Sequence, residues 1–292
     1  MMTLERLHDL GYRELFGYDF ALINPVRVRE ERWKDLPVVP LQAPAFDAQP
    51  HLVPRLLPLA ALNADQQVEL LKRNDRQCVE ADQPMFCALL ASPAETRSLA
   101  ASLGSRMLLD APTGQAVWLR FHDPRVFSAL AWWLDQDQIG CLLGQAQRWT
   151  WYEPRDASWH QLERPPVSGP RRLRLNKEQW DRLERQPLVN RTLKESGRTP
   201  PLGRPLRDLV ELVDAQLIRA AASGLAEATD LTRFAAMTAR HGETWINHPV
   251  ATRALSAAAE GRQTLAAGLA SLGHAELQQW ARASAVHKEE HA

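Results

Sequence analysis

The side chains that could do chemistry are few in this sequence, and they are scattered. His122 and Asp123 are adjacent, and an imidazole beside a carboxylate is a combination used by general bases and by metal sites. Neighbours on an extended segment point to opposite faces, however, so these two side chains do not converge on one ion. His241 and His248 are the nearest candidates for a histidine pair in the C-terminal part. We therefore predict no metal site and no bound cofactor.

No catalytic motif with a fixed spacing is recognisable. The sequence has no glycine-rich phosphate loop, no G-x-S-x-G turn and no C-x-x-C pair. Cys78, Cys87 and Cys141 have no metal-ligand spacing, and three sparse cysteines suit a reducing cytosol better than a disulfide framework. A hydrolase or transferase would need a site assembled from separate segments, with His122, Asp123 and His160 as its members. That enzyme remains one alternative.

The charge balance argues against two classes of partner. Thirty-five basic residues equal thirty-five acidic ones, so no overall field attracts nucleic acid or anionic lipid. The basic stretch 171–177 is short and lacks aromatic residues, which favours a solvated linker end. No apolar run approaches the roughly 20 residues of a membrane span, and the first residues lack the apolar centre of a signal peptide. We expect a cytoplasmic protein without nucleic-acid binding or membrane insertion.

Proline, glycine and periodicity divide the chain into two parts. Residues 1–163 alternate short apolar runs with helical patterns, which predicts an α/β or α+β domain with a mixed sheet. Residues 164–170, "RPPVSGP", predict a proline-rich linker. Residues 171–292 show only helical spacing and predict a helical lobe of four to six helices.

The first part contains several recognisable elements. Strands are predicted within 18–26, more weakly within 51–59, and within 85–92. Two hairpins are also predicted. The strands of the first lie on the two sides of the turn 112–115, and those of the second are 147–153 and 158–162. A helix is predicted over 63–80. Another is predicted to begin at "SPAE", with Ser92 as N-cap, Pro93 at N1 and Glu95 closing a capping box, and to end near Gly104 in a left-handed cap.

The stretch "AVWLRFHDPRVFSALAWWL", residues 116–134, predicts a strand that becomes a helix almost without a loop. Asp123 is a suitable N-cap and Pro124 suits the first helical position. Strand alternation predicts two faces. Val117, Leu119 and Phe121 would face the core, and Trp118, Arg120 and His122 would face the other side.

Two residues of the following helix are candidates for binding. Arg125 lies in the first turn, where a cation opposes the helix dipole, so we expect either a carboxylate or carbonyl partner within the chain or a role in binding. Trp133 falls on the apolar stripe with Val126, Leu130 and Leu134, whereas Trp132 falls on the opposite side near Arg125. Either Trp132 forms an interaction surface with Arg125, or it is covered by the other lobe or by Trp149 or Trp151.

The ordered series of these pieces resembles the effector adaptor and chaperone family of bacterial type VI secretion. The resemblance is carried by "YDFALINP", by "MFCALLASPAETRSLAASLGSRMLLDAPTGQAVWLRFHDPRVFSALAWWL", and by "LLGQAQRWTWYEP" followed by "SWHQL", over residues 18–162. The joint of that family maps onto Arg120, Phe121, Asp123, Pro124 and Arg125. Two positions depart from its pattern. The usual aspartate of the opening strand is Asn24, and the usual Gly-Pro is Gly144-Gln145.

The resemblance implies a protein without catalytic residues. It implies an adaptor that binds one cognate secreted effector in the cytosol and promotes its loading onto the secretion spike, a VgrG trimer or its PAAR tip. On this reading the effector docks on the helical lobe or in a groove between the lobes, and Trp132 and Arg125 are candidate contacts on the first lobe. An immunity protein that neutralises a toxin by binding it is a further alternative.

Overall fold

The chain divides into two compact units, Met1–Asn176 and Lys177–Ala292. A computed structural model of the 292-residue chain describes residues 5–7, 12–166, 172–197, 205–273 and 276. Residues 167–170 of the predicted linker lie outside the described residues. The predicted domain limits, 1–163 and 171–292, therefore stay a prediction.

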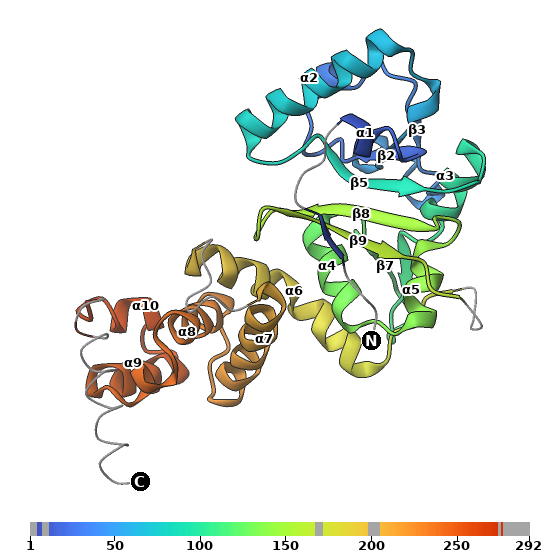
Figure 1. The fold of residues 1–292 in the computed structure, drawn as a ribbon. Helices are drawn as coiled ribbons and strands as arrows, with labels where there is room; N and C mark the ends of the chain where they lie inside the picture. Colours follow the sequence, from blue (N-terminus) through green and yellow to red (C-terminus); the bar gives the residue numbers. More distant parts are fainter. Residues whose placement is uncertain (1–4, 8–11, 167–171, 198–204, 274–275, 277–292) are drawn as a thin grey trace. The chain divides into compact units, whose positions relative to one another are not determined.

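The first unit contains a seven-stranded sheet with the strand order β1-β9-β8-β5-β2-β4-β3 (Figure 1). Its strands are β1 (Glu5–Leu7), β2 (Phe20–Ile23), β3 (Val39–Pro40), β4 (Arg55–Pro58), β5 (Phe86–Ala91), β8 (Arg148–Glu153) and β9 (Ser158–Glu163). A two-stranded sheet joins β6 (Leu108–Asp110) to β7 (Ala116–Trp118). The predicted fold class, a domain of strands and helices followed by a helical region, is confirmed.

The direction of the strands refines the predicted mixed sheet. Every pairing between the described strands is antiparallel. The helix α2 (Ala64–Ala81) connects β4 to β5, and such a connection usually joins parallel neighbours. Here β2 lies between β4 and β5 and runs against both, so the two helix-linked strands are parallel to each other but not paired.

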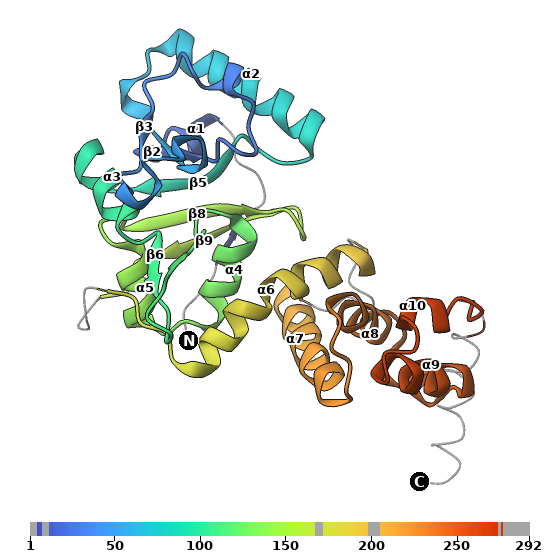
Figure 2. The same ribbon diagram turned by 180° about the vertical axis from the view of Figure 1, so that it is seen from behind.

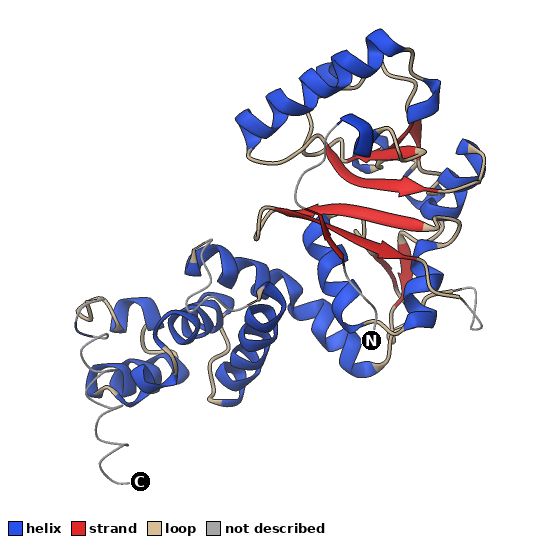
Figure 3. Ribbon diagram, viewed as in Figure 1, coloured by secondary structure: helices blue, strands red, loops and turns tan. Residues whose placement is uncertain are grey.

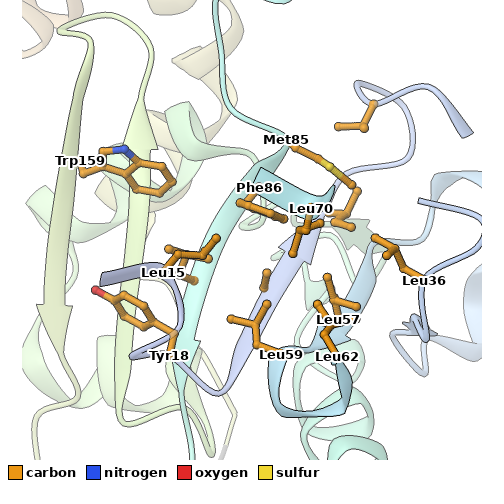
Figure 4. Close-up of a cluster of buried hydrophobic side chains, with 14 residues drawn as sticks. Leu15, Tyr18, Leu36, Leu57, Leu59, Leu62, Leu70, Met85, Phe86 and Trp159 are labelled. Atoms are coloured by element: carbon orange, nitrogen blue, oxygen red, sulfur yellow. The ribbon is translucent and has the colours of Figure 1, made fainter. Parts of the chain in front are cut away.

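One face of the large sheet is covered by α1 (Tyr12–Leu15) and by α2. Ala21, Ile23, Leu57, Leu89 and Trp159 point to this side, as strand register requires, and they form one buried cluster with Leu15 and Leu70. Figure 4 shows the labelled members of this cluster gathered over the strands. Only Leu70 and Gln77 of α2 are buried, so most of this helix faces solvent.

The opposite face packs against α4 (Pro124–Trp133), and Trp149 and Trp151 of β8 point to this side. Phe127 stacks on Trp149 with ring centroids 4.8 Å apart, and it meets Trp151 edge-on at 4.8 Å. Phe121 lies 5.7 Å from Trp149. All four rings are less than 2% exposed. Trp149 and Trp151 are therefore core residues of the first unit.

The helix α3 (Thr96–Gly104) begins later than the sequence predicted. Glu95 occupies the N-cap position, whereas the Ser92 hydroxyl donates to the backbone oxygen of Gln145 and accepts from the Ala94 N–H. A partner 53 residues away thus uses the predicted capping group. The helix does end at Gly104, but without the predicted left-handed cap. Gly104 is required there because a Cβ would lie 2.1 Å from the backbone oxygen of Gln42.

The remaining elements complete both units (Figures 2 and 3). In the first unit, α5 (Gln136–Leu143) follows α4, and short 3-10 turns occupy the connections. They are η1 (Glu30–Arg32), η2 (Pro44–Phe46), η3 (Pro50–Leu52) and η4 (Leu59–Ala61). In the second unit the helices are α6 (Lys177–Ser196), α7 (Leu206–Ala222), α8 (Ala228–His241), η5 (Glu243–Asn247), α9 (Pro249–Ala259) and α10 (Leu265–Gly268).

The helical unit is built around the buried face of α8, whose neighbours are α6, α7 and α10. Phe234 and Trp245 pack edge-on at 5.5 Å, and the Trp245 indole donates to Thr238 Oγ1 at 3.0 Å. The Asp230 carboxylate accepts from the Leu265 N–H at 2.9 Å and thereby fixes the start of α10. These helices agree with the predicted helical lobe, and α6 continues through Pro187.

Candidate functional site

The joint before α4 is a turn closed by Asp123. Its carboxylate accepts from the backbone N–H of Arg125 at 3.1 Å, and Pro124 occupies the first helical position, as predicted. The Asp123 N–H donates to the Arg120 carbonyl at 2.9 Å, so the chain turns before the helix begins. Phe121 is buried within this turn, whereas Arg120 is exposed and places its guanidinium 5.8 Å from the Trp118 ring.

The predicted strand faces are correct only in part. Leu119 and Phe121 are buried as expected, but Val117 is 38% exposed and His122 is buried. The strand β7 ends at Trp118, so strict alternation does not extend through the turn. Val117 pairs with the buried Leu109 in the small two-stranded sheet, yet it remains partly exposed itself. Tertiary position therefore overrides the period of two at both residues.

A pocket lies at the end of the strands where this joint meets β2, β5 and β8. We call it the arginine pocket and define it by Asn24, Arg27, Gln83, Asp123, Arg125 and Tyr152. Pro84, Pro124 and Pro154 also line it, as does Cys87. A register shift between β2 and β5 at Leu22/Ile23 accompanies this end of the sheet. Two positions from the sequence comparison, Asn24 and the Asp-Pro-Arg joint, thus come together in one place.

Two guanidinium groups converge on one carboxylate in the arginine pocket. Arg125 places Nε 3.1 Å from Asp123 Oδ1 and Nη2 2.9 Å from Oδ2. Arg27 places Nη2 3.5 Å from Asp123 Oδ2 and donates from Nη1 to Gln83 Oε1 at 3.2 Å. Burial raises the pKa of the Asp123 carboxyl, and Arg27 and Arg120 oppose that shift. The intramolecular partner expected for Arg125 is therefore Asp123.

Trp132 lies next to a second arginine. The Arg155 guanidinium is 5.6 Å from the centroid of the Trp132 ring, and both Trp132 and Trp133 are half-buried. Trp133 is thus less buried than its place on the predicted apolar stripe suggested, while Phe127 and Ala131 are buried on α4. The role of Trp132 and Arg125 in partner binding stays a prediction.

Arg155 is held by a buried polar network. It donates from Nε to Glu153 Oε1 at 2.7 Å and from Nη2 to Oε2 at 2.6 Å. The Ser128 hydroxyl donates to the same Oε2 at 2.5 Å and accepts from Trp151 Nε1 at 2.8 Å. Glu153 is fully buried, so this carboxylate depends on these donors. The network fixes α4 to β8 and positions the guanidinium beside Trp132.

The three residues of the enzyme alternative do not form a common site. His122 is buried between Trp118 and Phe121, and burial lowers its pKa to about 3, which makes it a weak base. The Asp123 carboxylate is occupied by the arginines. His160 stacks on Trp151 at 5.6 Å and uses Nε2 for both Asp156, at 3.0 Å, and Ser158, at 3.0 Å. A relay needs the base to use both ring nitrogens, so this trio is a local hairpin cluster.

No group of three or more His, Cys, Asp or Glu side chains within the described ranges is placed to hold a metal ion. Every helix in that part of the chain is too short or too polar to span a bilayer.

Sequence reasoning missed the residues that complete the site. Arg27, Gln83, Glu153 and Arg155 were not singled out, because each acts through a partner from another segment. One local signal was present for the last pair. Alternation along β8 puts Glu153 on the same side as Trp149 and Trp151, where an ionised group needs a cation. No local signal marks Arg27 or Gln83, which lie 96 and 40 residues before Asp123.

Comparison with known proteins gives one finding. The model of a family described as a domain of unknown function, DUF4123, matches residues 37–141. That segment includes the joint and α4 but ends before β8. No curated protein and no solved structure matches the chain.

Proposed function

We propose that this chain is an adaptor that binds a cognate effector of a type VI secretion system and promotes its loading onto the spike. The observation that carries the proposal is the family match over residues 37–141, because that family is known as an effector-adaptor domain of type VI secretion. The resemblance of residues 18–162 to the same family, judged from the order of the motifs, supports it. The proposed partners are the secreted effector and a VgrG or PAAR component.

The chemistry of the described residues supports a binding role over catalysis. His122 is buried and weakly basic, and His160 is bound within its own hairpin. The polar groups that converge are arginines and carboxylates, which suit recognition of a polypeptide. A Trp beside an Arg, as at Trp132 and Arg155, is a composition enriched in protein interfaces.

Affinity purification from the cells that encode the chain tests this proposal. The tagged full chain is purified from cytosol, and bound proteins are identified by mass spectrometry. We expect one effector-sized partner and a spike component with the wild type. Trp132→Ala and Arg125→Glu should lose the effector, with circular dichroism used to check that each variant is folded. Trp133→Ala, the neighbouring tryptophan on the same helix, is the matched control.

Two results would overturn the proposal in favour of its rivals. Death of the cell in which the gene is deleted, with secretion unaffected, would identify an immunity protein, because an adaptor is needed only for delivery. Turnover of a substrate that is lost in a folded His122→Ala variant would identify an enzyme. Wild-type protein that captures neither an effector nor a spike component would refute the adaptor role itself.

A further inference from the structure

We propose that the arginine pocket receives the carboxylate of an acidic side chain, an aspartate or glutamate, from a partner segment that crosses the pocket. The inference rests on the proposed function only for the identity of that partner. Its basis is the convergence of Arg27 and Arg125 on the single carboxylate of Asp123. The joint thus acts as a receptor for an acidic residue as well as a connection between elements.

The charge that reaches solvent in this pocket is positive. Of the residues that line it, two are cationic, Arg27 and Arg125, and one is anionic, Asp123. The side chains of the two arginines are 32% and 31% exposed, whereas the Asp123 side chain is 6% exposed. The neutralising carboxylate is therefore held inside while the guanidinium groups face outward. An incoming anion meets two cations without first meeting the buried anion.

Hydrogen-bond donors are also left over. Arg125 uses Nε and Nη2 on Asp123, and Arg27 uses Nη1 on Gln83 and Nη2 on Asp123. Among the described residues, nothing else accepts from the side chain of either arginine. A guanidinium has five donors in a fixed fork, so Nη1 of Arg125 and Nε of Arg27 remain for a ligand. A carboxylate can accept from both arginines at once.

The rim favours a segment that continues past the carboxylate over a free chain end. Pro84, Pro124 and Pro154 line the pocket, and Val26, beside Arg27 in the sequence, is 63% exposed. Apolar groups next to the arginines give contacts to residues on either side of an acidic side chain. Because prolines at the rim lose little conformational entropy on binding, such contacts are made at low entropic cost.

Binding of a defined probe to the full chain tests the inference without knowing the partner. The probe is N-acetylglutamate N-methylamide, and its neutral isostere is the glutamine analogue. Methionine methyl groups are labelled with 13C, since Met85 lines the pocket while Met107 is buried elsewhere in the same unit. Ionic strength is held constant. We expect the acidic probe to shift the Met85 signal saturably, and the neutral probe and the Met107 signal to show no such change.

Substitutions then identify the groups responsible. Arg27→Gln and Arg125→Gln should each weaken the probe about tenfold, the scale of one charge-assisted hydrogen bond. Asp123→Asn should tighten it about threefold or more, because both arginines lose their internal anion while asparagine still caps the helix. Arg76→Gln is the control, an arginine of the same unit that is paired with Glu69 and 62% exposed. It should leave the affinity unchanged.

The outcomes separate this inference from the adaptor proposal. Equal shifts with the glutamate and glutamine probes, or weaker binding in Asp123→Asn with its fold intact, would overturn the inference. Tighter binding of N-acetylglycylglycine, which offers a terminal carboxylate, would overturn the assignment to a side chain. None of these results affects the capture of an effector by the wild type, and the absence of an effector there would leave the probe titration standing.

Discussion

Replacing Ser128 with alanine should destabilise the first unit more than its size suggests. Ser128 is 1% exposed, and its hydroxyl donates to Glu153 Oε2 at 2.5 Å and accepts from Trp151 Nε1 at 2.8 Å. A hydrogen bond to a charged group contributes roughly 1.5–3 kcal/mol, and a buried N–H left without an acceptor costs roughly 1–3 kcal/mol. Glu153 keeps the guanidinium of Arg155, which limits the loss. We expect the free energy of unfolding to fall by about 3 kcal/mol.

Urea unfolding followed by near-ultraviolet circular dichroism measures this loss, since the buried tryptophans on β8 give the signal. With a slope of about 2 kcal/mol/M, the unfolding midpoint should fall by about 1.5 M at unchanged slope. Ser98→Ala is the matched control, because Ser98 is exposed on α3 and its hydroxyl donates to the side chain of Gln145. That variant should stay within about 0.5 kcal/mol of wild type.

Measuring Ser128→Ala in a Trp151→Phe variant separates the hydrogen bond to Glu153 from the hydrogen bond donated by Trp151. In Trp151→Phe the indole N–H is absent, so Ser128→Ala should cost less there than in wild type. A Ser128→Ala variant that melts like Ser98→Ala would refute the argument that the hydroxyl bridges Glu153 and Trp151. An equal cost in both backgrounds would show that the indole N–H contributes nothing to the network.

Three further predictions concern single contacts. Gly104→Ala should lower the melting temperature in calorimetry by several degrees, since its Cβ would lie 2.1 Å from the backbone oxygen of Gln42; an unchanged value would contradict the close approach. His122 has a pKa lowered to about 3, so the unfolded state binds more protons below about pH 6.5 and stability falls with falling pH. Between about pH 7 and pH 5 the free energy of unfolding should therefore fall by about 2 kcal/mol. In His122→Leu, denaturant titrations at the same pH values should no longer show this fall. Asp230→Ala should speed amide exchange at Leu265, which bonds that carboxylate, about tenfold or more, and equal protection would contradict the contact.

Local patterns predicted those elements whose causes are local. The apolar run after Tyr18 became β2, the hairpin of β8 and β9 formed on both sides of Pro154, and α2 begins after Asn63 with a capping box. In each case the deciding interactions lie within a few residues, such as the Asn63 side chain and the Gln66 N–H at 2.9 Å. Periodicity and capping chemistry are sufficient there.

The predictions failed where a distant segment supplies the partner. Ser92 has the residue type of an N-cap, yet its hydroxyl donates to the Gln145 backbone, and the helix starts at Thr96. Alternation placed His122 on the side away from the core-facing residues, but it is buried. A strand period applies only while the chain stays extended, and β7 ends before His122. Contacts across the fold are not encoded in the period of either segment.

The two readings of Arg125 that the sequence left open are compatible in the structure. Pairing with Asp123 offsets the unfavourable position of a cation in the first helical turn, and the same pairing fixes the direction of the guanidinium. A fixed guanidinium that is still 31% exposed loses less conformational entropy on meeting a second carboxylate than a mobile one does. Arg27, held by Gln83 and Asp123, is prepared in the same way. The ion pair at this joint therefore orients the guanidinium groups for an acidic partner, while the charge of Asp123 offsets part of their attraction for it.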